Sequence, residues 1–62
     1  MKKTLTERER ELQGLMRTDE GRAELEVLAS RYAAAGGEPR AHRGSLVTYI
    51  LVYERVAGLL RA

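Results

Sequence analysis

The chain has 62 residues, no cysteine, tryptophan or phenylalanine, and 11 lysines and arginines against 9 aspartates and glutamates, a formal net charge of +2. A chain this short has room for one domain, residues 1–62, and hides only about 60% of its unfolded surface. Disulfides are excluded, so we expect another means of support for the small core, such as a partner chain. The modest charge also excludes a dense basic stripe of the kind that binds nucleic acids electrostatically.

The composition is typical of a folded domain, with 44% hydrophobic and 32% charged residues. The longest apolar stretch, residues 46–53, is interrupted by Thr48. A bilayer span needs about 20 apolar residues, so we expect no membrane segment. The basic start lacks the apolar stretch of a secretory signal, and the absence of cysteine fits a reducing compartment. These features together predict a cytoplasmic protein.

The first periodic segment predicts a helix over about residues 6–17. Thr6 and Glu9 have the spacing of a capping box, in which each side chain satisfies a free backbone N–H at the helix start. Gly14 should weaken this helix by roughly 1 kcal/mol relative to alanine. The apolar residues that share one face are Leu5, Leu12, Leu15 and Met16.

The second segment predicts a helix over about residues 19–35. Thr18 is its expected N-cap, and Gly36 is its expected C′ residue, in the left-handed conformation that ends many helices. Pro39 prevents the helix from continuing. The expected inner face consists of Gly21, Leu25, Leu28, Ala29, Tyr32 and Ala35, and the opposite side carries small residues.

The third segment predicts a helix over about residues 46–61, capped by Ser45. Its wide apolar face contains Leu46, Tyr49, Ile50, Val52, Tyr53, Val56, Ala57, Leu59 and Leu60. Val47 and Leu51 stand on the other side, so the first half of the helix is apolar all round. Such a helix is normally buried on all sides, and the two amphipathic helices before it offer too few large side chains to cover it.

The predicted fold class is therefore all-α: a three-helix unit whose apolar third helix packs in a homodimer. The residues expected at the interface between copies are Tyr49, Val52, Tyr53, Val56, Leu59 and Leu60. We expect the tyrosines to be bulky parts of the core or interface, with their hydroxyls at its rim. Higher oligomers are an alternative to the dimer.

The sequence contains few residues that could act as nucleophiles or zinc ligands. A Ser-His-acid site would need the single histidine, His42, held against Ser30 or Ser45, and we interpret His42 as an exposed loop residue. One histidine and no cysteine cannot build a zinc site, and no phosphate-binding glycine motif is present. We predict no enzyme activity, no metal and no cofactor. Glu54 is interpreted as an exposed flank of the third helix, in preference to a buried contact across a symmetric interface.

The best candidate for a ligand contact is the basic loop before the third helix. Arg40 and Arg43 precede Ser45 there, and a helix start with two guanidinium groups suits an anion or the carboxylate of an acidic protein partner. The simpler interpretation is that Ser45 only caps the helix and both arginines face water.

The leading functional hypothesis is a small non-enzymatic protein-interaction module that forms homo-oligomers by burying its third helix. The alternative is a DNA-binding regulator that contacts phosphates through Arg40, Arg43, Lys2 and Lys3. The third helix disfavours this alternative, because it presents apolar side chains where a recognition helix presents polar ones.

Overall fold

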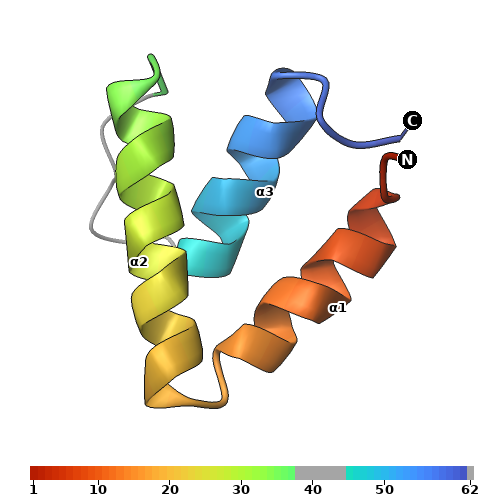
Figure 1. The fold of residues 1–62 in the computed structure, drawn as a ribbon. Coiled ribbons are helices and arrows are strands. Elements are labelled where there is room, and N and C mark those ends of the chain that lie inside the picture. Colours follow the sequence, from red (N-terminus) through yellow and green to blue (C-terminus); the bar gives the residue numbers. More distant parts are fainter. Residues whose placement is uncertain (38–44, 62) are drawn as a thin grey trace.

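A computed structural model describes residues 1–37 and 45–61, and three α-helices account for most of them (Figure 1). These are α1 (Leu5–Leu15), α2 (Asp19–Ala34) and α3 (Leu46–Val56). Helices α1 and α2 diverge from the turn that joins them, and α3 packs against both. The prediction of an all-α three-helix fold is confirmed. None of the helices in the described part of the chain is long and apolar enough to cross a bilayer.

Helix α1 begins earlier than its sequence suggests. Thr4 is the N-cap: its hydroxyl accepts a hydrogen bond from the Glu7 N–H at 3.2 Å, and the Glu7 carboxylate accepts one from the Thr4 N–H at 2.8 Å. The predicted capping box at Thr6 and Glu9 is therefore wrong by two residues. Both pairs have the required spacing, and the earlier start adds backbone bonds such as Arg8 N–H to Thr4 C=O at 3.0 Å.

Helix α2 begins and ends as predicted. Thr18 is its N-cap and accepts a hydrogen bond from the Gly21 N–H at 2.9 Å. At the other end Gly36 has a φ of 103°, and the Gly37 N–H reaches back to the Tyr32 carbonyl at 2.9 Å. This is the glycine-dependent Schellman ending, in which the chain turns left-handed and satisfies carbonyls of the last turn.

Helix α3 begins at the predicted cap, since the Ser45 hydroxyl accepts a hydrogen bond from the Thr48 N–H at 3.0 Å. It ends at Val56, however, and the prediction that it extends to residue 61 is wrong. Gly58 has a φ of 75°, and the Leu59 N–H bonds to the Glu54 carbonyl at 2.8 Å, which makes a second Schellman ending. The prediction failed because the apolar residues at 57–60 continue the helical spacing beyond the point where the helix ends.

The core lies where the three helices meet. Its buried members are Leu12 from α1, Leu25 and Ala29 from α2, and Val47, Ile50 and Leu51 from α3. Half-buried side chains pack around them, including Leu15, Met16, Leu28, Tyr32, Leu46, Tyr49 and Leu60. The inner faces predicted for the first two helices are thus confirmed in their centres, whereas Leu5 and Ala35 at their ends are exposed.

The inward side of α3 differs from the predicted one. Val47, Ile50, Leu51 and Glu54 are buried, a spacing of three, four and seven residues that defines one helical face. Val47 and Leu51 were expected to stand apart from the main apolar face, and they instead form the core contact within a single chain. The edge of the predicted face, at Val52, is left exposed.

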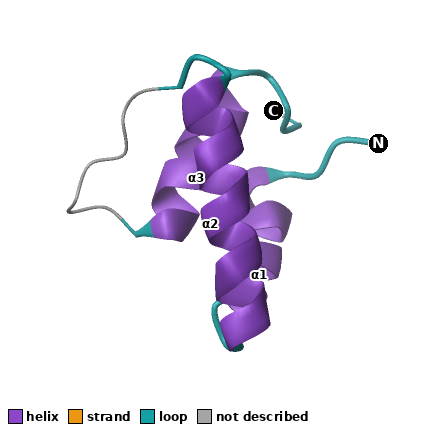
Figure 2. Cartoon of the chain, turned by 60° about the vertical axis from the view of Figure 1, so that its left-hand side comes forward, coloured by secondary structure: helices purple, strands orange, loops and turns teal. Residues whose placement is uncertain are grey.

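The two ends of the described chain lie side by side. The Arg61 N–H donates a hydrogen bond to the Lys3 carbonyl at 2.7 Å, and Thr4 and Arg61 form an isolated parallel bridge. Figures 1 and 2 both show the N- and C-terminal segments emerging on the same side of the molecule. Residues 57–61 therefore return from the end of α3 to the start of α1.

Gly14 and Gly21 provide a matched test of the packing between α1 and α2. A Cβ at Gly21 would overlap the carbonyl group of Leu15, whereas a Cβ at Gly14 would meet nothing within 4 Å. Gly21→Ala should lower the free energy of unfolding by about 1–3 kcal/mol, because α1 and α2 must separate. Gly14→Ala should raise it by about 0.5–1 kcal/mol through helix propensity. Urea denaturation of both variants measures these changes, and equal effects would contradict the close approach at Gly21.

Candidate functional site

The carboxylate of Glu54 is the point at which all three helices meet through polar side chains. Glu54 is 3% exposed. The guanidinium of Arg8, from α1, donates two hydrogen bonds to it, Nε to Oε1 at 2.8 Å and a terminal nitrogen to Oε2 at 2.9 Å. The hydroxyl of Tyr32, from α2, donates a third to Oε2 at 2.6 Å. This parallel, two-pronged geometry is the strongest form of arginine–carboxylate pair.

The neighbours of Glu54 have shifted acid–base properties. Burial, together with the hydrogen bond to Glu54, raises the pKa of Tyr32 to about 12. The hydrogen bonds to Glu54 also raise the pKa of Arg8 above its already high usual value. Tyr32 is therefore a neutral hydrogen-bond donor and Arg8 a permanent cation at physiological pH. In the described part of the chain, no buried side-chain polar atom lacks a hydrogen-bond partner.

The prediction that Glu54 is an exposed flank is wrong. The interpretation rested on its place beside Arg55 at the end of an apolar run. The useful signal was its spacing: Glu54 lies seven residues after Val47 and three after Leu51, on the face that packs inward. Its partners Arg8 and Tyr32 lie 46 and 22 residues away in the sequence, so no local pattern identifies them.

Tyr32 is further held by an aromatic contact with α3. Its ring stacks on Tyr53 with centroids 4.1 Å apart and an angle of 14° between the planes. Gly37 allows this arrangement, because a Cβ there would lie 2.7 Å from the Tyr32 carbonyl oxygen and 3.0 Å from the Tyr53 ring. Tyr32 thus packs against the core, and the half-buried Tyr53 covers its ring.

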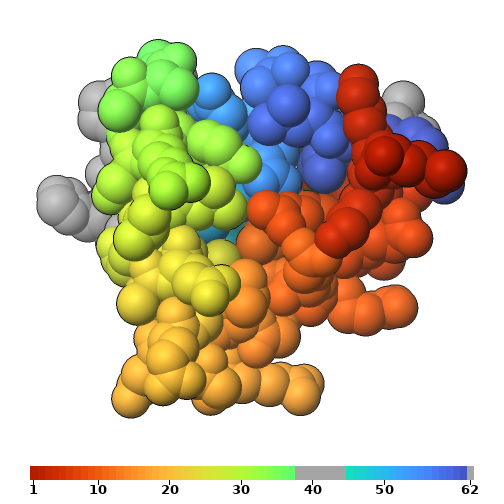
Figure 3. All heavy atoms as spheres, in the orientation of Figure 1, coloured from red at the N-terminus to blue at the C-terminus, as the bar shows by residue number. Residues whose placement is uncertain are grey.

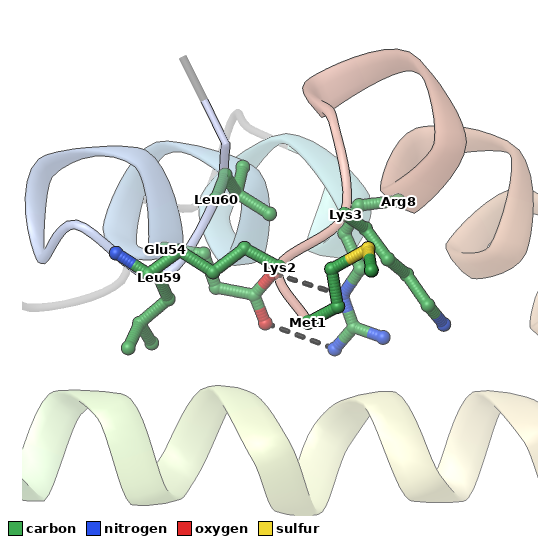
Figure 4. A pocket seen from close by; sticks show the side chains of 7 residues that line it. All are labelled: Met1, Lys2, Lys3, Arg8, Glu54, Leu59 and Leu60. Carbon is green, nitrogen blue, oxygen red and sulfur yellow. Dashed lines mark hydrogen bonds and ion pairs between the residues drawn. The ribbon is translucent and has the colours of Figure 1, made fainter.

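An open hollow of about 440 Å³ lies beside the Arg8–Glu54 pair (Figure 4). Its lining residues come from the two adjacent ends of the chain and from the pair itself: Met1, Lys2, Lys3, Arg8, Glu54, Leu59 and Leu60. Lys3 pairs with Glu11, which also pairs with Arg8, and the hydrogen bond from Lys3 lowers the pKa of Glu11. Of these cations, Lys2 forms no ion pair with any described residue.

The six residues predicted at the interface fall into two groups. Tyr49, Tyr53 and Leu60 are half-buried within the chain itself. The other three are exposed: Val52 by 56%, Val56 by 82% and Leu59 by 48% of their surface. We call Val52, Val56 and Leu59 the apolar edge. The structure thus divides the predicted interface into a part that completes the core and a part that faces outward.

The predicted anion contact is only partly described. Ser45 acts as the helix cap and also donates a hydrogen bond to the Thr48 hydroxyl at 2.9 Å. Arg40, Arg43 and His42 lie outside the described residues. The basic loop therefore remains a prediction from sequence.

The site consists of a structural contact, between Glu54 and its partners Arg8 and Tyr32, and of the apolar edge of the same chain. Across residues 1–37 and 45–61, no group of three histidine, cysteine, aspartate or glutamate side chains could hold a metal ion. No protein-family model, curated protein or solved structure matches this chain.

The shifted pKa of Tyr32 predicts a specific loss of stability in alkali. The folded state holds this phenol neutral, so its contribution is fully present below pH 10 and is lost as the pH rises through about 12. Tyr32→Phe should be less stable by about 1 kcal/mol near neutral pH. The difference in unfolding free energy between wild type and variant should shrink above pH 10. Urea denaturation across this range measures it, and a constant difference would contradict the contact with Glu54.

Proposed function

We propose that this chain is a small non-enzymatic protein-interaction module that binds a second copy of itself through the apolar edge. The observation that carries the proposal is the distribution of large exposed apolar side chains. Among the described residues these are Met1, Leu5, Val27, Val52, Val56 and Leu59. All but Val27 lie in or beside the paired chain ends and the outward side of α3.

This concentration supports an interaction surface because the core beneath it is already complete. Ile50, Leu51 and Glu54 lie on the inward side of α3, and Val52 and Val56 lie outside the core. Apolar side chains scattered singly need no explanation, whereas a contiguous group is typical of a surface that another molecule covers. Burying one such side chain contributes about 1.5–3 kcal/mol, which a dimer gains twice. A cysteine-free chain with this surface suits the cytoplasm, where we place its action.

Self-association should depend on protein concentration and on the apolar edge. We expect the average mass in sedimentation equilibrium to rise with concentration in the micromolar range, together with the melting temperature. Val56→Glu should abolish this rise without unfolding the chain, because Val56 is already 82% exposed. Gln13→Glu is the matched control: it adds the same charge at an exposed position of α1 and should leave the association unchanged.

Two outcomes would overturn the proposal. One is a wild-type mass that stays at 7.0 kDa throughout the concentration range. The other is a shift of duplex DNA at low salt that is lost when Lys2 and Lys3 are changed to alanine. That result would favour the regulator that contacts phosphates, whose binding should fall steeply as salt is added.

A further inference from the structure

The apolar edge carries positive charge that another apolar edge cannot neutralise. Arg55 lies between Val52 and Val56 in α3, and Lys2 lines the hollow beside Leu59. Neither cation forms an ion pair with a described residue, and Glu54, the acidic residue that precedes Arg55 in the sequence, is buried against Arg8. The edge is therefore apolar with unpaired cations around it.

A symmetric dimer would bring these cations together. In a two-fold interface both copies use the same surface, so each cation near the symmetry axis faces a cation of the other copy. Like charges placed across an interface weaken it and select against that pairing. A surface with unpaired carboxylates would be a better partner for the apolar edge than its own copy would be.

Helices α1 and α2 of the same chain provide such a surface. A groove of about 650 Å³ runs between α1 and α2. Figure 3 shows the two helices meeting along their lower halves, with α3 and the C-terminal segment filling the space between their upper halves. Leu15 and Leu28, both half-buried, contribute apolar surface to the groove above the buried Leu25. Val27, the one large exposed apolar side chain of α2 among the described residues, also lines it.

The half of the groove nearest the α1–α2 turn carries the opposite charge from the apolar edge. Glu20 and Glu24 line it one helical turn apart, and neither has an ion-pair partner among the described residues. Arg31 lines the groove seven residues after Glu24, about 10 Å along the helix axis. Arg8 and Glu11 also line the groove, but they are already engaged, Arg8 with Glu54 and Glu11, and Glu11 with Lys3 as well. The half of the groove nearest the α1–α2 turn is therefore acidic.

From this complementarity we infer that the copies associate head to tail, with the apolar edge of one chain seated in the α1–α2 groove of the next. The inference rests on the proposed function and adds which two surfaces meet. Val52, Val56 and Leu59 cover the apolar floor of the groove, and Arg55 and Lys2 face the carboxylates of Glu20 and Glu24. Because the two surfaces differ, each copy has one edge and one groove to offer. Such contacts build rings or open chains of copies instead of closing at two.

Mixing two singly disabled variants tests this arrangement. Val56→Glu disables the edge and Val27→Glu disables the groove, and both positions are already exposed, so the fold should survive. Each variant alone should associate at least tenfold more weakly than wild type in sedimentation velocity. Their equimolar mixture should form a complex of two chains and stop there, because one intact edge meets one intact groove. Wild type should grow beyond two chains as its concentration rises.

The possible outcomes distinguish head-to-tail association from the proposed self-association on which it rests. If Val27→Glu associates as wild type does and forms no mixed complex with Val56→Glu, the copies pair edge to edge, and the inference is wrong while the proposed function stands. A monomeric wild type overturns both. Circular dichroism and thermal melting establish that each variant is folded. Should either glutamate variant unfold, Val27→Ser and Val56→Ser remove the same apolar groups without a new charge and enter the same mixing experiment.

Discussion

The carboxylate of Glu54 is the constraint on which the arrangement of the three helices depends. A charged group that is 3% exposed is costly unless its hydrogen-bonding capacity is satisfied, and two helices supply the donors. Arg8 fixes the position of α1 relative to α3, and Tyr32 does the same for α2. Apolar packing alone tolerates sliding and rotation, whereas these three hydrogen bonds are made in one arrangement of the helices.

The contact of Glu54 with Arg8 and Tyr32 also determines which side chains of α3 are exposed. Helix α3 is apolar on nearly every side, so hydrophobicity does not select which side turns inward. Turning Glu54 towards Arg8 and Tyr32 buries Ile50 and Leu51 on the same face and leaves Val52 and Val56 outside. The apolar edge is thus a consequence of how the single acidic residue of α3 is accommodated. The fold and the proposed function are connected at this residue.

Much of the fold follows from local sequence. Thr18 and Ser45 act as N-caps, Gly36 ends α2, and the inner faces of the first two helices lie inward as their periodicity predicts. The errors occur where two local patterns compete. Thr4 and Thr6 both offer a capping box, and Gly58 ends α3 within an apolar spacing that continues beyond it. In the structure the earlier start of α1 is accompanied by the bond from the Arg8 N–H to the Thr4 carbonyl, and the end of α3 by the bond from the Leu59 N–H to the Glu54 carbonyl.

The candidate surface was only half predictable for a related reason. The surplus of apolar residues in residues 46–60 is visible in the sequence, and three of the six residues expected at an interface are exposed in the single chain. Which three are exposed depends on the rotation of α3, and therefore on the pair formed by Arg8 and Glu54 across 46 residues. A pairing over that separation leaves no signal in periodicity, composition or charge pattern.

The most direct test of this account is a double-mutant cycle on Arg8 and Glu54. The variants Arg8→Met and Glu54→Gln preserve the size of each side chain, and urea denaturation of both single variants and the double variant yields a coupling energy. Measurements at low micromolar concentration limit association between copies. The account predicts a favourable coupling of at least about 1 kcal/mol, within the range of about 0.5–3 kcal/mol found for contacting residues. Single effects that add to within about 0.3 kcal/mol would show that Glu54 does not hold the helices together.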